Sequence, residues 1–175
     1  MSEPCLHFRP LEERDFEMLV RWLAEPEIAR WWTHPASLDD VRTKYLPRIR
    51  GSEPVRMWIV EVDGVPAGLL QSYRHSDHAE TDALIGIERA VGVDYLLAGS
   101  HRGRGIARPM LAAFSDLVLD VYRDCDVCVA APPKSNEPSW RALESAGFQR
   151  FGCCDHPIEG PQYVYIRSRE PAESG

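Results

Sequence analysis

A glycine- and arginine-rich loop between a strand pattern and a helical pattern is the segment of this chain that is most informative about chemistry. The run Arg102-Gly103-Arg104-Gly105 follows the apolar residues of 91–97 and directly precedes a helical stripe. Glycines let backbone N–H groups turn toward a phosphate, and a helix N-terminus adds a partial positive charge. The segment matches neither a Walker A loop nor G-x-G-x-x-G. It predicts a pyrophosphate cradle, and the alternative is a tight turn with two incidental arginines.

A single carboxylate interrupts the apolar strand pattern just before this loop. Asp94 stands between apolar neighbours within residues 91–97. An ionised group in that position costs several kcal/mol unless it is paired or hydrogen-bonded. Asp94 is therefore a candidate functional residue, and the alternative is an aspartate at the edge of a sheet that pairs with an arginine.

Five cysteines raise the question of metal or redox chemistry. Cys125 and Cys128 have the C-x-x-C spacing, which can bind zinc or exchange disulfides. A zinc site needs two further ligands at matching spacing, so a buried strand with small apolar side chains is the simpler explanation. Cys153 and Cys154 are adjacent, so their side chains should point to opposite sides of a strand. We expect free thiols, no metal and a cytoplasmic location.

Hydrophobic periodicity and turn residues outline the elements that must position these groups. Strands are expected at 6–9, 55–62, 65–73, 91–97, 127–130, 148–153 and 163–167, and helices at 12–24, 37–48, from the glycine loop to about 122, and at 136–146. The Asp63-Gly64 pair predicts a hairpin turn. Residues 74–82 are polar and acidic and predict a loop or an irregular excursion, and Ile85 with Ile87 predicts a small strand. This order indicates one α/β domain over 1–175, with a mixed central sheet, flanking helices and a frayed tail at 170–175.

Composition narrows the class of protein. The chain has 175 residues, of which 44% are hydrophobic and 27% charged, and its net charge is −7. These values are ordinary for one globular domain. The acidic balance argues against a nucleic-acid partner, no apolar run is long enough to span a bilayer, and the N-terminus does not resemble a signal peptide. The charge fits a small cationic partner, or simply a protein that is soluble in water.

Two motifs resemble a known family. Residues 102–107 have the pattern R-x-x-G-x-A, which is similar to the coenzyme A signature of the GCN5-related N-acetyltransferases (GNAT). The helix that Asn136 opens ends in Ala-Gly-Phe at 146–148, like the second segment of that family. The resemblance covers about 6–167 and implies the GNAT fold. The segments that are specifically similar to aminoglycoside 6′-N-acetyltransferases are Trp22-Leu23, Trp31-Trp32, Asp40-Val41, Tyr45-Leu46-Pro47, Gln71-Ser72-Tyr73 and 92–97.

The resemblance implies an acetyl-CoA-dependent N-acetyltransferase in which an amine attacks the thioester directly and no metal takes part. Asp94 corresponds to the aspartate that holds the reactive ammonium and takes its proton, and backbone N–H groups near Leu96 would polarise the carbonyl. The implied cofactor-binding residues are Leu96, Leu97, Arg102, Gly103, Arg104, Gly105, Ile106, Ala107 and Asn136. The implied substrate-binding residues are Trp32, Tyr73, Asp77, Glu80, Asp94 and Glu159, which suit a cationic aminoglycoside.

Several of these residues also have a simpler explanation. Asn136 can serve as a helix cap, and it can do so while binding the cofactor. Trp32 and Tyr73 can be packing residues, and the acids Asp77 and Glu80 can belong to a solvated face.

Two positions depart from the pattern of the aminoglycoside enzymes. Ala131 stands where they carry an aspartate before a proline, and Leu143 where many GNAT members place a tyrosine near the leaving sulfur. The first departure suggests an acceptor with fewer amines than kanamycin, and kasugamycin, acetylated at its 2′-amine by similar enzymes, is the candidate beside an ordinary 6′-amine. Either reaction would confer antibiotic resistance. The alternatives are a siderophore-pathway lysine N-acyltransferase, an N-terminal protein acetyltransferase and a coenzyme A-binding module without transfer activity.

Overall fold

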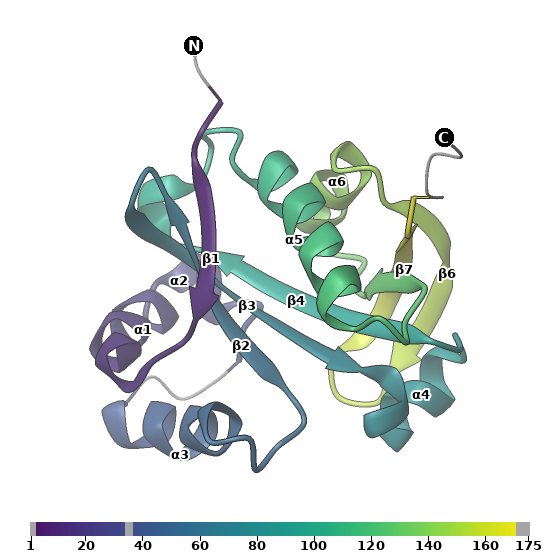
Figure 1. Ribbon diagram of the computed structural model, residues 1–175, viewed down its shortest axis with the longest axis horizontal. Coiled ribbons are helices and arrows are strands. Elements are labelled where there is room, and N and C mark those ends of the chain that lie inside the picture. The colour runs from purple at the N-terminus through teal and green to yellow at the C-terminus, as the bar shows by residue number, and fades with distance from the viewer. Residues whose placement is uncertain (1–2, 34–36, 171–175) are drawn as a thin grey trace. The chain divides into compact units, whose positions relative to one another are not determined.

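A seven-stranded sheet in the order β1-β2-β3-β4-β5-β7-β6 organises the computed structural model, which describes residues 3–33 and 37–170 (Figure 1). β4 and β5 are parallel, whereas β1–β2, β2–β3, β5–β7 and β6–β7 are antiparallel pairs. The sheet is therefore mixed, as the order of the elements predicts. The strands are β1 (Leu6–Pro10), β2 (Arg56–Val62), β3 (Val65–Arg74), β4 (Ala90–Leu97), β5 (Val127–Ala130), β6 (Gln149–His156) and β7 (Gly160–Ser168).

Helices and short 3-10 turns connect the strands. The helices are α1 (Phe16–Leu23), α2 (Pro26–Ala29), α3 (Leu38–Ile49), α4 (Ala79–Ile85), α5 (Ala107–Val121) and α6 (Glu137–Ser145), and the 3-10 turns are η1 (Glu13–Asp15), η2 (His75–Asp77) and η3 (Gly99–His101). Within the described ranges, no helix is both long and apolar enough to cross a membrane. Of the tail that the sequence predicts to fray, 171–175 lie outside the described residues.

The chain separates into two compact units, and the first contains Met1–Ser72 and Asp94–Met110. Its β2–β3 hairpin turns at Asp63 and Gly64, which both have positive φ, 51° and 80°. This is the turn that the Asp-Gly pair predicts. Apolar side chains of the hairpin form part of a buried interior, among them Met57, Ile59, Val60, Leu69 and Leu70.

The second unit contains Tyr73–Val93 and Leu111–Gly175. All four residues of β5 are buried, which explains why this strand has a continuous apolar sequence rather than an alternating one. Val127 and Val129 pack in a cluster with Ala90 and Val164. The apolar run of β5 was therefore sufficient to identify a central strand.

The prediction for residues 74–87 is wrong. Instead of a polar loop and a small strand, the segment contains η2 and α4, and α4 ends at Gly86 in a left-handed conformation with a φ of 67°. Ile85 and Ile87 both pack against the cluster around Ala90, from the end of the helix and from the turn that follows. Two alternate apolar residues fit a strand as well as a helix end, so such a short pattern could not distinguish them.

Helix α3 carries a half-buried lysine. The helix begins after Ser37, whose Oγ accepts a hydrogen bond from the backbone N–H of Asp40 at 3.1 Å, as expected for a serine cap. Tyr45 is fully buried, and the Lys44 Nζ lies 5.9 Å from the centre of its ring. Burial, followed by the positive charge of Arg48, lowers the pKa of Lys44 to about 8. The folded structure therefore disfavours the charged form of Lys44.

We expect Lys44→Met to raise the free energy of unfolding near pH 7, and this gain to shrink as the pH rises. The folded chain releases the Lys44 proton near pH 8, whereas the unfolded chain keeps it until about 10.5. Across that interval the unfolded state binds more protons, so the wild type gains stability that the methionine variant does not gain. Urea denaturation of both proteins across this pH range measures the effect.

The exposed Lys134 provides the control, and Lys134→Met is measured over the same pH range. A difference between wild type and Lys44→Met that does not vary with pH contradicts the prediction.

Candidate active site

An amide side chain from β3 holds the carboxylate of Asp94. Gln71 Nε2 donates a hydrogen bond to Asp94 Oδ2 at 2.7 Å, and both residues are half-buried. This bond offsets part of the cost of removing a carboxylate from water. The sequence left open a pairing of Asp94 with an arginine. In the structure an arginine lies one step further away, because Arg48 Nη1 donates to Gln71 Oε1 at 2.9 Å.

Arg48 is itself fixed by several contacts. Its Nε donates to Glu53 Oε2 at 3.0 Å, its Nη1 lies 3.7 Å from Met57 Sδ, and its guanidinium carbon lies 5.8 Å from the centre of the Tyr45 ring. The register of β2 and β3 places Met57 opposite Gln71, so both are within reach of one side chain from α3. We call Glu53, Arg48, Gln71 and Asp94 the Asp94 chain.

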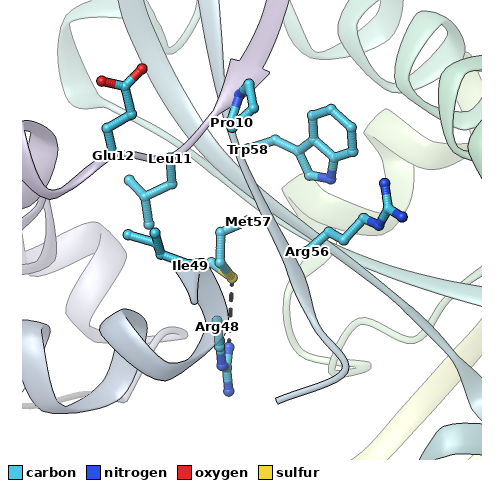
Figure 2. A pocket seen from close by; sticks show the side chains of 8 residues that line it. All are labelled: Pro10, Leu11, Glu12, Arg48, Ile49, Arg56, Met57 and Trp58. Atoms are coloured by element: carbon cyan, nitrogen blue, oxygen red, sulfur yellow. Dashed lines mark hydrogen bonds between the residues drawn. The ribbon is translucent and has the colours of Figure 1, made fainter. Parts of the chain in front are cut away.

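Arg48 also lines a pocket of about 410 Å³ near the start of β2 (Figure 2). Figure 2 shows its contact with the Met57 sulfur, and shows Arg56 and Trp58 on the other side of the β2 ribbon. None of the site residues predicted from the sequence is among the residues that line this pocket. The lining residues are Pro10, Leu11, Glu12, Arg48, Ile49, Arg56, Met57 and Trp58.

Trp32 is connected to the same helix. Its Nε1 donates to the hydroxyl oxygen of Tyr45 at 3.2 Å, and burial raises the pKa of that hydroxyl. The ring of Tyr45 thus contacts the indole of Trp32 through its oxygen and lies within 6 Å of the cations of Lys44 and Arg48. Trp31 lies instead beneath Arg30, whose guanidinium carbon is 4.7 Å from the indole centre.

The glycine loop has the backbone conformation that its sequence predicts. Gly103 and Gly105 have φ values of +71° and +73°, and a Cβ added to either would meet no heavy atom within 4 Å. The loop therefore requires glycine for its conformation, and the space beside these residues is open. The N–H of Met110 donates to the carbonyl of Ile106 at 3.0 Å. The N–H groups at the start of α5, which come before Met110, have no acceptor within the helix. These features fit a phosphate.

The arginines of the loop are less available than the sequence suggests. Arg102 Nη2 lies 2.5 Å from Glu25 Oε2, and the backbone N–H of Gly99 donates to the same oxygen at 2.8 Å. Arg104 makes a long contact of 3.5 Å with the Ser100 carbonyl and is exposed. A carboxylate of this chain therefore already neutralises Arg102.

The end of β4 comes very close to β3. A Cβ added to Gly68 would overlap the carbonyl oxygen of Leu96, and the N–H of Ala98 donates to the carbonyl of Ala67 at 2.8 Å. Leu96 is buried and Leu97 half-buried. Only glycine at position 68 allows this approach, which fixes the backbone that leads from Asp94 into the loop.

The remaining predicted site residues belong to the second unit. Tyr73, at the end of β3, lies 6.0 Å from the ring of His75 and 5.0 Å from that of His78. His75 is buried, and this burial lowers its pKa. Asp77 in η2 and Glu80 in α4 are exposed. Tyr73, Asp77 and Glu80 therefore lie on three elements that follow one another in the chain, β3, η2 and α4.

Asn136 and Glu159 lie on other elements of this unit. The Asn136 Oδ1 accepts a hydrogen bond from the N–H of Ser139 at 3.4 Å, so it caps α6, as the simpler explanation stated. Glu159 is exposed in the turn between β6 and β7, and Gln162 Nε2 donates to its Oε2 at 2.6 Å.

Cys128, Cys153 and Cys154 lie on strands, whereas Cys5 and Cys125 precede them. Cys128 is buried in β5, and burial raises the pKa of its thiol and of the Cys125 thiol. Cys153 is exposed and Cys154 half-buried on β6, so the two face opposite sides as predicted. Across residues 3–33 and 37–170, no group of three or more His, Cys, Asp or Glu side chains is arranged to hold a metal ion.

Sequence reasoning missed several residues that the structure connects to the site. Gln71 belongs to a segment that the resemblance included, but its contact with Asp94 needed the register of β3. Arg48 and Glu25 gave no signal, because their partners Gln71 and Arg102 are 23 and 77 residues away in the chain.

Comparisons with known proteins agree with this architecture. A family model described as an acetyltransferase (GNAT) domain matches residues 12–156. The chain is 31% identical over 184 residues to the aminoglycoside N(6′)-acetyltransferases type 1 of Klebsiella pneumoniae and Serratia marcescens, covering 98% of this chain and 87% of each relative. The solved structure of aminoglycoside acetyltransferase AAC(6′)-Ib with coenzyme A and kanamycin is similar at a TM-score of 0.82 and 31% identity, covering 94% of this chain and 95% of that one. Fold, motifs and relatives agree, and the chain belongs to the GNAT acetyltransferase family.

Proposed function

We propose that this chain transfers an acetyl group from acetyl-CoA to an amino group of an aminoglycoside. The observation that carries the proposal is Asp94, an aspartate oriented by Gln71 on the strand that leads into the glycine loop. Family membership supports the reaction class, and relatives that are 31% identical over almost the whole chain are aminoglycoside N(6′)-acetyltransferases.

The glycine loop would hold the pyrophosphate of acetyl-CoA, mainly through its backbone. Gly103 and Gly105 leave open space beside the loop. The backbone amides of Ile106 and Ala107 lie at the N-terminus of α5. Arg104 adds an exposed positive charge. Bound acetyl-CoA supplies the activated thioester. The backbone at Leu96 and Leu97 would face the acyl group, Arg102 the phosphates, and Asn136 the pantetheine arm in addition to its role as a cap.

Asp94 would accept the proton of the reacting amine. An aminoglycoside amine arrives as an ammonium ion, and only the neutral form can attack a carbonyl carbon. A carboxylate oxygen of Asp94 would first pair with the ammonium and then take one proton from its nitrogen. The neutral amine would then form the C–N bond to the acetyl carbon while the C–S bond breaks, and coenzyme A would leave as a thiolate that takes a proton from water. The hydrogen bond from Gln71 stabilises the ionised carboxylate, so Asp94 is ready to receive the cation.

The acceptor would lie against aromatic and acidic side chains. Trp32 and Tyr73 offer ring faces, which suit both sugar rings and ammonium groups. Asp77, Glu80 and Glu159 are exposed carboxylates that would pair with further amines of the acceptor.

We infer that the preferred acceptor carries few ammonium groups. Ala131, directly after β5, offers no carboxylate, and the cations of Lys44 and Arg48 on α3 lie within 6 Å of the Tyr45 ring. Each exposed pair between an ammonium and a carboxylate contributes only about 0–1 kcal/mol, so a polycation needs several acids. Kasugamycin therefore suits this site better than kanamycin or tobramycin.

The cofactor assignment predicts that Gly105→Val abolishes acetyl-CoA binding while the fold persists. A valine side chain would fill the open space beside the loop, where the phosphates would lie. Gly64→Val is the matched control, because Gly64 also has a positive φ, +80°, and also has nothing within 4 Å of an added Cβ. Both variants carry similar backbone strain, yet only Gly105→Val should lose binding in a calorimetric titration. Equal affinity in the two variants rules out the loop as the cofactor site.

The catalytic assignment predicts that Asp94→Asn lowers kcat/KM for an aminoglycoside by about 100-fold or more, the usual scale of a positioned acid–base group. Asparagine can still accept the hydrogen bond from Gln71, so acetyl-CoA affinity and stability should hardly change. The exposed Asp39→Asn on α3 serves as the control. Near-normal turnover by Asp94→Asn from about pH 6 to about pH 9 would mean that another group takes the proton.

The acceptor assignment predicts a higher kcat/KM for kasugamycin than for kanamycin or tobramycin. All three are compared at one salt concentration, because screening changes the affinity of charged substrates. A preference of about tenfold or more for kanamycin or tobramycin, about 1.4 kcal/mol, would favour an ordinary 6′-enzyme and remove the significance of Ala131. If none of the three is acetylated, the aminoglycoside assignment fails and a lysine-derived siderophore amine becomes the leading acceptor.

A further inference from the structure

The Asp94 chain is a continuous series of hydrogen bonds, and its far end, Arg48 and Glu53, takes no part in the reaction proposed above. Glu53 accepts from Arg48 at 3.0 Å, Arg48 donates to Gln71 at 2.9 Å, and Gln71 donates to Asp94 at 2.7 Å. All four residues belong to one compact unit of the chain. They come from α3, from the segment after it, and from strands β3 and β4.

The chemistry of arginine decides the orientation of the Gln71 amide. A guanidinium has only donors, whereas an amide has a carbonyl oxygen on one side and an NH2 group on the other. With Arg48 on one side, Gln71 must turn its oxygen toward the guanidinium and its NH2 toward Asp94. Without Arg48, only the Asp94 carboxylate would favour this orientation, so the amide would be held from one side and could rotate more freely.

Arg48 is held firmly enough to impose this orientation. Its side chain is only 16% exposed, Glu53 fixes its Nε, and the Met57 sulfur lies 3.7 Å from its Nη1. The bond to Gln71 is also charge-assisted, which makes it stronger than a bond between neutral groups. Arg48 therefore influences Asp94 through its hydrogen bond to Gln71.

We propose that Arg48 and Gln71 are positioning residues, which orient the Asp94 carboxylate and keep it ionised to receive the ammonium of the acceptor. The inference rests on the proposed role of Asp94. It assigns a kinetic function to α3, a helix that contributes no residue to the cofactor loop.

Charged groups of α3, of the segment after it and of β4 act on one another along the Asp94 chain. Lys44 and Arg48 are cations on α3, and Glu53 is the anion that follows the helix. The charges of Arg48, Glu53 and Asp94 all act on Lys44, whose pKa is about 8. Titration of Lys44 therefore affects the basic limb of a pH profile, whereas loss of the Gln71 donor affects the acid limb.

A double-mutant cycle with Arg48→Met and Gln71→Met tests the proposal. Each single variant should lower kcat for the acceptor by about tenfold or more, as expected when a reacting group loses its orientation. Each should also move the acid limb of kcat/KM to higher pH, because a carboxylate without its donor protonates more readily. Acetyl-CoA affinity should not change. The double variant should be no slower than Gln71→Met alone.

Three variants separate positioning from a purely structural role. Arg50→Met removes the next arginine in the sequence, the mostly exposed cap residue that follows α3, and should leave the kinetics unchanged. Arg48→Lys keeps a charged donor and should recover part of kcat. Gln71→Glu keeps an oxygen for Arg48 but turns a second oxygen toward Asp94, so it should lower kcat. If Arg48→Met slows the enzyme equally in the wild-type and Gln71→Met backgrounds, Arg48 does not act through Gln71 and the proposal is wrong.

A second readout does not depend on activity. Carbon-13 NMR of the Asp94 carboxyl group should show its titration displaced to higher pH, by the same amount, in Arg48→Met and Gln71→Met. If Arg48→Met fails to fold, Gln71→Met and Gln71→Glu provide the same test. A wild-type protein that acetylates no aminoglycoside overturns the proposed function alone. An unchanged Asp94 titration in the variants overturns this inference, whatever the substrate is.

Discussion

A carboxylate placed in a strand between apolar neighbours must find hydrogen-bond donors, and this requirement shapes the first unit of the protein. Asp94 receives a donor from Gln71, and Gln71 can offer its NH2 group because Arg48 occupies its carbonyl oxygen. Arg48 in turn needs Glu53, since a mostly buried cation is costly without a counter-charge. The position of α3 against β2 and β3 is thus linked to the ionisation of a single aspartate.

The same helix sets the electrostatics of the site. Lys44 and Arg48 bring two cations toward the ring of Tyr45, while Asp94 and Glu53 bring two anions. The two positive and two negative charges nearly cancel, so this group of residues does not present the net negative charge that would attract a polycation. The disfavoured ammonium of Lys44 indicates that some stability is lost to maintain this arrangement, which is common where function requires buried polar groups.

In the glycine loop, neighbouring residues determine the backbone conformation, whereas a residue far away in the sequence determines how much positive charge is available. The positive φ of Gly103 and Gly105 and the start of α5 depend only on local sequence. The availability of Arg102 does not, because Glu25 neutralises it from the N-terminal side of α2. Arg102 is therefore paired within the chain, whereas Arg104 stays exposed beside the backbone amides of the loop.

Local sequence signals predicted most of the fold. The Asp63-Gly64 turn and the serine cap of α3 rest on contacts within a few residues. The apolar run of β5 is contiguous in the sequence, so periodicity and turn chemistry can detect all three. The pattern failed for residues 74–87, where Ile85 and Ile87 are too few to distinguish a strand from the end of a helix. The loop, the Asn136 helix and the family could be predicted for the same reason, because each motif is contiguous.

The sequence by itself determined that Asp94 is a carboxylate in an apolar strand and therefore needs a partner, and that the following loop needs glycine. It could not determine which partner. Gln71, Arg48 and Glu25 make contacts that depend on the register of β2 and β3, the packing of α3 and the position of α2. A hydrogen bond acts over about 3 Å, whereas sequence patterns record only neighbours along the chain. Only the tertiary structure brings residues 23 or 77 positions apart within that distance.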